Sequence, residues 1–344
     1  MNYFADASKA RVQITRAQEK AISDMYRSLA RDISREIESL RQKTNVSSRI
    51  RSEYLRDLSR QINEELRRIG ENQNSSIRNA MTAVSQAVVD NNAKMLSSFG
   101  VNIAGISSKI PTEVVREIAS GELYKDRWNL SSAIWRNTVK SQEKINMIVA
   151  QGVAGQKSTL DIARDIEKYV KPTKAKPSRT IVTKKYTIDE NGKKVPRLDS
   201  SGKPIVSKFY FGRVDYNAQR LARTMVSHAY QDTLLRTTRD NPFVECYEWL
   251  TSNSDRVCEI CKERAENFHG VIIDGVQMLG YYYADDVPLD HPNGMCTLDV
   301  YIPYSYDEIA DRIANWANGE SDSGLDDFAE SLGFSPSTFK SKVR

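Results

Sequence analysis

The sequence predicts an α+β protein with a long helical N-terminal region, a basic hairpin-like insertion and a small C-terminal α+β module. Apolar residues recur every three or four positions through the first hundred residues, and no proline occurs before Pro111. Between 179 and 211, β-branched and aromatic residues alternate with turn signals instead. Two further strand-like stretches, 244–252 and 297–303, bracket a cysteine-containing segment. These changes of pattern define the predicted organisation.

The helical region 1–100 contains three runs with helical spacing. Their apolar positions are Ile22, Met25, Leu29, Ile33, Ile37 and Leu40, then Ile50, Tyr54, Leu58, Ile62, Leu66 and Ile69, then Ile77, Met81, Val84, Val88 and Met95. We expect one helix to end at Gly70 and another at Phe99-Gly100, because glycine commonly ends helices. A narrow apolar stripe with abundant Arg and Glu is typical of long antiparallel or coiled helices. Such a region either packs on itself as a bundle or serves as a partner-docking arm.

Shorter helices are predicted in the middle region, 101–170. Pro111 stands near the start of the first, and Ser158 or Thr159 caps the last. The basic hairpin-like insertion, 171–211, follows, with "ENGKK" and "SSGKP" as its turns.

The C-terminal module, 212–304, begins with a helix that contains "LARTMVSHAYQDTLL" and continues into the two strands around the cysteines. An acidic helical tail, 305–344, closes the chain with one or two helices, in "SYDEIADRIANWAN" and "LDDFAESLGF". The module and its tail are therefore expected to differ in charge from the insertion before them.

Charge is distributed unevenly along the chain. The net charge is +5, yet residues 171–213 hold nine Lys and three Arg against three acidic residues, while the tail from Tyr304 holds eight acidic against four basic residues. Such asymmetry indicates two kinds of partner surface. No apolar run is long enough to cross a bilayer, and the N-terminus lacks the apolar core of a secretory signal. We therefore expect no disulfide scaffold, and clustered cysteines favour metal binding.

Three of the four cysteines fall in one segment. Cys258 and Cys261 form a CxxC pair, and His291 and Cys296 form a second pair with four residues between them. Zinc takes four soft or borderline ligands in a tetrahedron, and a CxxC turn supplies two thiolates. The two pairs together predict a closed, zinc-knuckle-like Cys3His site, which is structural because it has no open position. Asp290, directly before the histidine, is expected to orient its imidazole.

Other interpretations of these residues stay open. A reduced thiol pair without metal fits a long loop between the two halves, whereas a redox motif needs the CxxC at the start of a helix after a strand. His269 is an alternative ligand, although "NFHGVIIDG" favours the start of a hairpin. Cys246 alternates within a strand and is expected to be a buried apolar residue, and His228, in mid-helix, is expected to be structural.

Catalysis finds less support in the sequence. A zinc deaminase has His-x-Glu before Pro-Cys-x-x-Cys, whereas here the CxxC comes first and His291 begins no His-x-Glu. An HNH-type nuclease is closer, because a CxxC knuckle can precede an Asp-His pair, but no histidine follows His291. We therefore expect a non-enzymatic protein, with a zinc-dependent nuclease or DNA-processing enzyme as the alternative.

Four stretches of the C-terminal module stand out together: "LARTMVSHAYQDTLL", "YEWLTSNSDRVCEIC", "FHGVIIDG" and "PLDHPNGMC". They resemble the phage head-morphogenesis proteins, which are minor head proteins similar to protein F of phage Mu and the SPP1-type minor capsid protein. The family pattern has an Arg-Thr helix, a Trp strand, an Asp before CxxC, a Gly turn and a closing His-Pro-Asn-Cys-Arg-Cys. The residues that match it are Arg223, Thr224, Trp249, Asp255, Cys258, Cys261, Gly275, His291, Pro292, Asn293 and Cys296.

The resemblance covers about residues 210–303 and contains two departures. Gly294-Met295 stands where the family has Cys-Arg, so only the last cysteine of that motif remains. Met225 stands where an acidic residue often follows the Arg-Thr pair. The first departure leaves a four-ligand site intact, and the second concerns a polar contact at the surface.

The resemblance implies a minor structural protein of a tailed-phage virion. Such a protein associates with the portal protein and with scaffold or capsid protein during head assembly. Its expected location is inside the head near the portal, and the host cytoplasm during assembly. Some relatives leave the head with the DNA at infection, which makes DNA ejection a further expectation.

The basic insertion is expected either to be an edge protected against aggregation or to contact double-stranded DNA. The lysines spaced along both arms and the turn are Lys184, Lys185, Lys193, Lys194 and Lys208. Binding would be independent of base sequence, because no element is built to read base edges.

Overall fold

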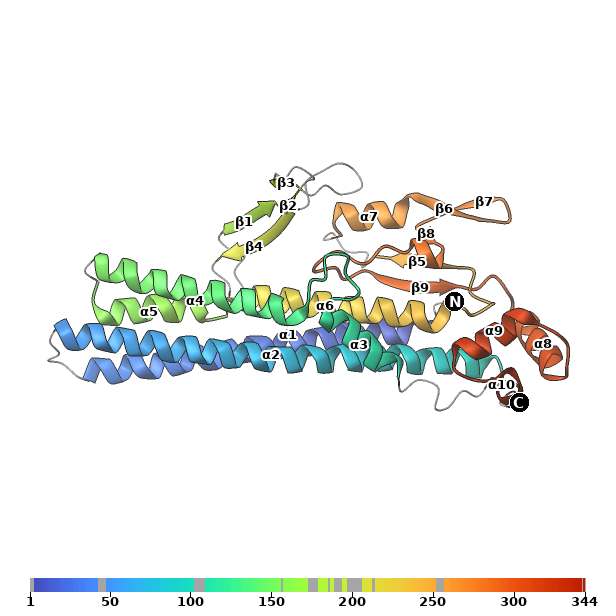
Figure 1. Ribbon diagram of the computed structural model, residues 1–344, viewed down its shortest axis with the longest axis horizontal. Coiled ribbons are helices and arrows are strands. Elements are labelled where there is room, and N and C mark those ends of the chain that lie inside the picture. The colour runs from blue at the N-terminus through green and yellow to red at the C-terminus, as the bar shows by residue number, and fades with distance from the viewer. Residues whose placement is uncertain are drawn as a thin grey trace. The chain divides into compact units, whose positions relative to one another are not determined.

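The computed structural model describes residues 3–42, 48–101, 109–155, 157–172, 179–184, 186–188, 194–196, 206–211, 214–251, 257–341 and 343. The protein is mostly helical with a small C-terminal sheet region, as the sequence predicts (Figure 1). The helices are α1 (Ala5–Gln42), α2 (Ser48–Ser98), α3 (Ile110–Ser120), α4 (Leu130–Ala154), α5 (Thr159–Val170), α6 (Val214–Thr238), α7 (Glu259–Glu266), α8 (Tyr306–Ala317), α9 (Ser323–Ser331) and α10 (Pro336–Lys340), with the 3-10 turn η1 (Ala284–Asp286). The strands are β1 (Arg179–Lys184), β2 (Tyr186–Ile188), β3 (Lys194–Pro196), β4 (Val206–Phe211), β5 (Cys246–Leu250), β6 (Phe268–Ile273), β7 (Val276–Leu279), β8 (Tyr281–Tyr282) and β9 (Thr297–Tyr301). In the described part of the chain, no helix combines the length and the apolar character that a membrane span requires.

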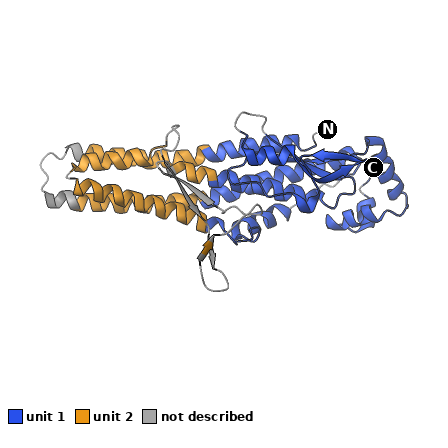
Figure 2. Cartoon of the chain, turned by 90° about the horizontal axis from the view of Figure 1, so that it is seen from above, with its two compact units in different colours: residues 1–19, 74–131, 221–344 blue, residues 20–73, 132–220 orange. Residues whose placement is uncertain are grey.

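The chain divides into two compact units, coloured separately in Figure 2. Unit 1 comprises residues 1–19, 74–131 and 221–344, and unit 2 comprises residues 20–73 and 132–220. Helices α1, α2 and α6 each contribute to both units, so residues 1–100 are shared between the two.

Unit 2 is built on long amphipathic helices. Its buried residues follow the predicted apolar spacing and include Ile22, Leu29, Ile33, Leu58, Ile62, Leu66, Ile69, Ile145, Ile162 and Ile166. Polar contacts join antiparallel parts of α1 and α2: Gln73 Nε2 donates to Tyr26 Oη (3.1 Å), and Tyr54 Oη donates to the Glu36 carbonyl (3.3 Å). Burying one stripe of each helix stabilises these helices far more than their intrinsic propensity does.

The expected helix end at Gly70 is wrong, because α2 continues through it. A Cβ atom at Gly70 would lie 3.1 Å from Thr138 Oγ1 and 3.3 Å from Ile134 Cγ2, both on α4. The glycine therefore permits close packing of α4 against α2, and this contact offsets its helix propensity cost of about 1 kcal/mol. The end predicted at Phe99-Gly100 is confirmed, since α2 stops at Ser98 and Gly100 has a φ of 86°.

The predicted cap of α5 is confirmed, and α8 has a cap that the sequence analysis did not predict. Ser158, rather than Thr159, caps α5, and its side chain accepts from the Asp161 amide (3.1 Å). Ser305 and Glu308 form a capping box at the start of α8. The sequence did not predict the short helix α10, which places Phe339 in a buried contact with Trp316.

The basic insertion has the backbone of an extended hairpin. Strand β1 pairs antiparallel with β4, and β2 pairs antiparallel with β3. The predicted turns at "ENGKK" and "SSGKP" lie outside the described residues, except for Lys194 in β3.

Unit 1 contains an antiparallel sheet of order β8-β5-β9, in which Trp249 lies opposite Leu298 and Tyr247 opposite Val300. These four side chains are buried. Tyr230 on α6 donates its hydroxyl to the Leu298 carbonyl (3.1 Å), so α6 packs against this sheet. Between β5 and β8 the chain forms α7 and then the hairpin β6–β7. The sheet and α6 thus carry the segments that hold the cysteines and His291.

Candidate metal centre

The predicted ligands lie on three elements of unit 1. Cys258 is the N-cap residue of α7 and Cys261 lies in its first turn. His291 lies in the segment after η1, and Cys296 directly precedes β9. All four cysteines are free thiols. The CxxC pair thus stands at a helix N-terminus, where the helix dipole stabilises thiolates.

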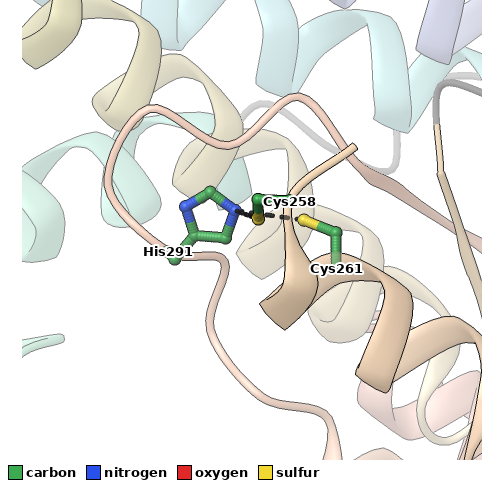
Figure 3. Close-up of side chains that lie close together, drawn as sticks. All are labelled: Cys258, Cys261 and His291. Atoms are coloured by element: carbon green, nitrogen blue, oxygen red, sulfur yellow. Dashed lines mark hydrogen bonds between the residues drawn. The ribbon is translucent and has the colours of Figure 1, made fainter. Parts of the chain in front are cut away.

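Two thiols and one imidazole converge on a common point (Figure 3). His291 Nε2 lies 3.2 Å from Cys258 Sγ and 3.0 Å from Cys261 Sγ, and the three ligand atoms all lie within 4.8 Å of one another. With zinc bonds of about 2.3 Å to sulfur and about 2.0 Å to nitrogen, tetrahedral ligand atoms are separated by roughly 3.5–3.8 Å. The two nitrogen–sulfur distances are therefore within about half an ångström of those around a tetrahedral zinc ion.

The second ring nitrogen of His291 determines which tautomer faces the sulfurs. Nδ1 lies 3.2 Å from the Pro292 carbonyl oxygen, which can only accept a hydrogen bond. The proton therefore resides on Nδ1, and the lone pair of Nε2 points at Cys258 and Cys261. Metal-binding histidines are commonly oriented in this way by a backbone carbonyl.

Cys296 lies beside this cluster rather than within it. Its thiol is close enough to Cys261 to affect the pKa of that thiol, but its sulfur is not within 4.8 Å of all three other ligand atoms. Burial raises the pKa of Cys261, and the nearby Cys296 and Cys258 thiols raise it further. Burial also raises the pKa of Cys296. Without a metal ion, buried neighbouring thiols of this kind stay protonated. A bound cation favours the deprotonated thiolate instead.

One buried polar atom beside the cluster lacks a partner that a metal-bound thiolate would supply. The indole N–H of Trp249 is buried, has no hydrogen-bond acceptor in the described structure, and favours the thiolate form of Cys296. A deprotonated Cys296 would accept from this N–H, as sulfurs of metal sites commonly do. The donor set and this orphaned donor therefore both fit a bound metal ion.

Asp290 acts on the backbone of His291 rather than on its ring. Its Oδ1 accepts a hydrogen bond from the His291 amide (2.8 Å), whereas His291 Nδ1 faces the Pro292 carbonyl. The expected contact between the Asp290 carboxylate and the imidazole is therefore not present, and the carboxylate bonds the backbone instead. Burial raises the pKa of Asp290. A Cβ at Gly294 would lie 2.0 Å from Asp290 Oδ2, so any larger residue here would displace the Asp290 carboxylate.

Residues of α6 that carry the family resemblance hold the turn between His291 and Cys296. Thr224 Oγ1 accepts from the Asn293 amide (2.9 Å), and Arg223 bonds Asn293 Oδ1. Ser227 Oγ donates to the Gly294 carbonyl (3.1 Å). Asn293 has a φ of 74°, a left-handed conformation that asparagine tolerates better than most residues. The polar side of α6 therefore fixes the backbone that carries His291 and leads to Cys296.

Arg11 is a contributor that sequence reasoning missed. Its buried guanidinium donates to the carbonyls of Cys296 (2.9 Å) and Met295 (2.8 Å) and to Ser227 Oγ (3.3 Å). Burial lowers the pKa of Arg11, and the nearby Tyr230, Asp290 and Cys296 raise it in part. A sequence separation of 285 residues from Cys296 leaves no local signal for this contact.

The remaining predicted histidine roles agree with the structure. His228 is buried, its Nδ1 lies 2.8 Å from Tyr124 Oη and its Nε2 lies 2.9 Å from the Asp290 carbonyl. Burial lowers the pKa of His228 to about 4, so it is a neutral structural residue. His269 belongs to the predicted hairpin, where its ring stacks on Tyr282 (4.3 Å between centroids). Cys246 is fully buried in β5.

The proposed DNA-binding lysines are not brought together by any described contact. Lys184, Lys194 and Lys208 lie on β1, β3 and β4, but their side chains are outside the described residues. Lys185 and Lys193 lie outside the described residues altogether. The DNA hypothesis therefore rests on sequence alone.

Comparison of the chain with protein-family models, with curated proteins and with solved structures finds no match.

Proposed function

We propose that the protein is a non-enzymatic structural protein of a tailed-phage head whose C-terminal module is stabilised by a zinc ion. Cys258, Cys261, His291 and Cys296 would hold the ion. The observation that carries this proposal is the convergence of both thiols of the CxxC pair on the Nε2 lone pair of one oriented imidazole. The zinc ion would supply a cross-link between α7 and the segment before β9, which the thiols alone do not make.

The donor set favours zinc in a structural role. Thiolate and imidazole ligands in a tetrahedral arrangement suit zinc better than the hard cations, which prefer oxygen. Four protein ligands leave no position for a water or a substrate, whereas a catalytic zinc site keeps one open. Cys296 supplies the fourth ligand in this proposal, because its thiol is close enough to Cys261 to raise the pKa of that thiol. For Cys296 to complete the tetrahedron, the chain before β9 would have to move its sulfur into the cluster.

The assignment to a phage head rests on the resemblance of the motifs, supported by how their residues bond. Arg223 and Thr224 lie 70 and 69 residues from Asn293 in the sequence, and both bond to it beside the cluster. The proposed partners are the portal protein and scaffold or capsid protein, at the portal inside the head and in the host cytoplasm during assembly. The basic insertion is proposed to contact double-stranded DNA without reading its sequence, and the protein to accompany DNA at ejection. Co-purification with a portal-sized ring from infected cells tests this assignment, and consistent absence from such rings would contradict it.

Metal content tests the zinc site directly. We expect elemental analysis to give about one zinc per chain. Cys258→Ser and Cys296→Ser should each lose most of that zinc and lower the melting temperature of unit 1. Cys246→Ala is the matched control, because this buried cysteine lies in β5 outside the cluster. A metal-free preparation that melts at the same temperature as the metal-loaded protein would contradict the proposal.

A further inference from the structure

One arginine of unit 1 bridges the two segments that carry the CxxC pair and His291. Arg264 lies in the last turn of α7, three residues after Cys261, and its side chain is 18% exposed. Its Nη2 donates a hydrogen bond to the Leu289 carbonyl (3.2 Å), which lies two residues before His291. The hydrogen bond therefore joins the helix that carries both thiols in Figure 3 to the loop that carries the imidazole.

The same guanidinium faces a second group beside His291. Arg264 Nη1 lies 3.9 Å from Asp290 Oδ1, and the Asp290 side chain is 3% exposed. Within the described structure, Arg264 Nη1 and Asp290 Oδ2 are both buried and have no hydrogen-bond partner. The two side chains carry opposite charges, and a buried charge requires a partner of this kind. Since Asp290 Oδ1 also accepts from the His291 amide (2.8 Å), the carboxylate links the guanidinium to the backbone of His291.

The flat face of the guanidinium packs on a residue beside the fourth candidate ligand. Arg264 Cζ lies 4.6 Å from the centroid of the Trp249 ring, which is a cation–π contact. The buried indole N–H of Trp249 lies beside Cys296. The Arg264 side chain is therefore in contact with the surroundings of both His291 and Cys296, and its own helix carries the other two candidate ligands.

The backbone of Arg264 is fixed as well. Its carbonyl accepts hydrogen bonds from Tyr282 Oη (3.0 Å) and from His269 Nε2 (3.1 Å), and the two rings stack on each other. The last carbonyls of a helix have no partner within the helix, so these bonds anchor the end of α7. An anchored backbone and three directed side-chain contacts allow Arg264 to set how α7 faces the loop of His291.

We propose that Arg264 is a positioning residue of the metal site, which holds His291 in register with the two thiols of α7. The inference rests on the zinc site proposed above. Arg264 is not a ligand, because a guanidinium has hydrogen-bond donors only. Its effect passes through the Leu289 carbonyl and Asp290 to His291, so it determines how well the imidazole is placed. Groups that orient a metal ligand in this way contribute about 10–100-fold to metal affinity.

A residue that acts through His291 differs in a measurable way from one that only stabilises unit 1. If Arg264 acts by placing the imidazole, its replacement weakens zinc binding only while the imidazole is present. If Arg264 is merely structural, its replacement has the same effect on zinc affinity with or without His291, because independent effects add.

Three variants of the full chain test this difference: Arg264→Met, His291→Ala and the two together. Methionine keeps an apolar stem against Trp249 and removes the donors and the charge. Competition with chelators of graded affinity, below the melting temperature of every variant, measures the Kd for zinc. Arg264→Met should raise this Kd by about 10–100-fold in the wild-type background. It should raise the Kd by less than about threefold in the His291→Ala background.

The matched control is Lys262→Met, which removes a positive charge from an exposed position on the same helix. It should bind zinc like the wild type. Melting curves establish that each variant folds, and Arg264→Lys, with a smaller loss in the same pattern, replaces Arg264→Met if that variant does not fold. Wild-type zinc affinity in Arg264→Met, or equal losses in both backgrounds, would overturn the positioning role and leave the zinc site standing. A wild type without zinc affinity would overturn the zinc site itself and this inference with it.

Discussion

Replacing Arg11 with methionine is expected to weaken both the fold of unit 1 and its affinity for metal. Arg11 is 2% exposed, and its guanidinium donates to the carbonyls of Met295 and Cys296. Methionine has a similar length and no donors, so the substitution removes hydrogen bonds without opening a large cavity. It leaves the backbone beside Cys296 without the contact that holds it against α1.

The magnitude follows from those contacts. Each buried carbonyl left without a donor costs about 1–3 kcal/mol, and two carbonyls lose theirs. Removing a buried charge offsets part of this loss, which leaves a destabilisation of about 3 kcal/mol. For a unit of about 200 residues, that value corresponds to a fall in Tm of roughly 6–12 °C. Loss of a group that positions a metal ligand weakens metal binding by about 10–100-fold.

Calorimetry of the zinc-loaded protein and competition with a chelator of known affinity measure the two effects. Arg16→Met is the matched control, because Arg16 lies on the same helix and is exposed. We expect the control to change the Tm by less than about 2 °C and to leave zinc affinity unchanged. If Arg11→Met behaves like Arg16→Met, the contact of α1 with the Cys296 segment does not support the site.

Three further predictions follow from other parts of the chain. Gly294→Ala should destabilise unit 1 by about 1–3 kcal/mol and reduce zinc content, because its Cβ would lie 2.0 Å from Asp290 Oδ2 and force the carboxylate to move; an unchanged melting curve and zinc content would refute this. Burial raises the pKa of Asp299 to about 6. Between about pH 4 and pH 6 the folded state therefore keeps a proton that the unfolded state has released. Above pH 6 the buried carboxylate is charged and lowers the free energy of unfolding by about 3 kcal/mol. Asp299→Asn should therefore raise the free energy of unfolding by up to that amount at about pH 8 and by about half as much at about pH 5, and an equal effect at both values in urea titrations would contradict the argument. Wild-type protein should bind duplex DNA, and the logarithm of its affinity should fall with the logarithm of the salt concentration at a slope of roughly −0.9 per phosphate contact. A variant with five lysines replaced by glutamine should flatten that slope by several contacts and still fold, and absence of salt-dependent binding at low ionic strength would refute DNA contact. The replaced residues are Lys184, Lys185, Lys193, Lys194 and Lys208.

Local patterns made the secondary structure predictable, whereas packing decided the exceptions. The stripe spacing and the caps are properties of neighbouring residues, so Ser158 and the end of α2 at Gly100 could be found without the fold. Gly70 signals a helix end when only its neighbours are considered. Its actual role depends on Ile134 and Thr138, which lie on a helix more than sixty residues later. Tertiary contact therefore overrides the local signal at this position.

The same distinction applies to the metal centre. The ligand types and the short spacings within Cys258–Cys261 and within His291–Cys296 are visible in the sequence. The groups that orient them are not, because the Pro292 carbonyl is a backbone atom and the Arg11 contact spans 285 residues. A sequence motif shows which atoms bind a metal, but the fold determines their tautomer, burial and angle.

The contacts between the N-terminal segment and the metal centre change how a docking role of the N-terminal helices must be tested. Deletion of residues 1–100 is the simplest test of such a role, but this segment contributes the Phe4 amide to Asp299 (3.2 Å) and the Arg11 guanidinium to the Cys296 carbonyl (2.9 Å). The deletion would remove support for the metal centre together with any docking surface, so a loss of association would not locate that surface. Arg27→Glu/Arg31→Glu, on the exposed side of α1 in unit 2, leaves these contacts intact. If the N-terminal helices dock to the portal through this side, the variant should lose co-sedimentation with a portal-sized ring at unchanged zinc content. Retained co-sedimentation would exclude this side of α1 as the docking surface.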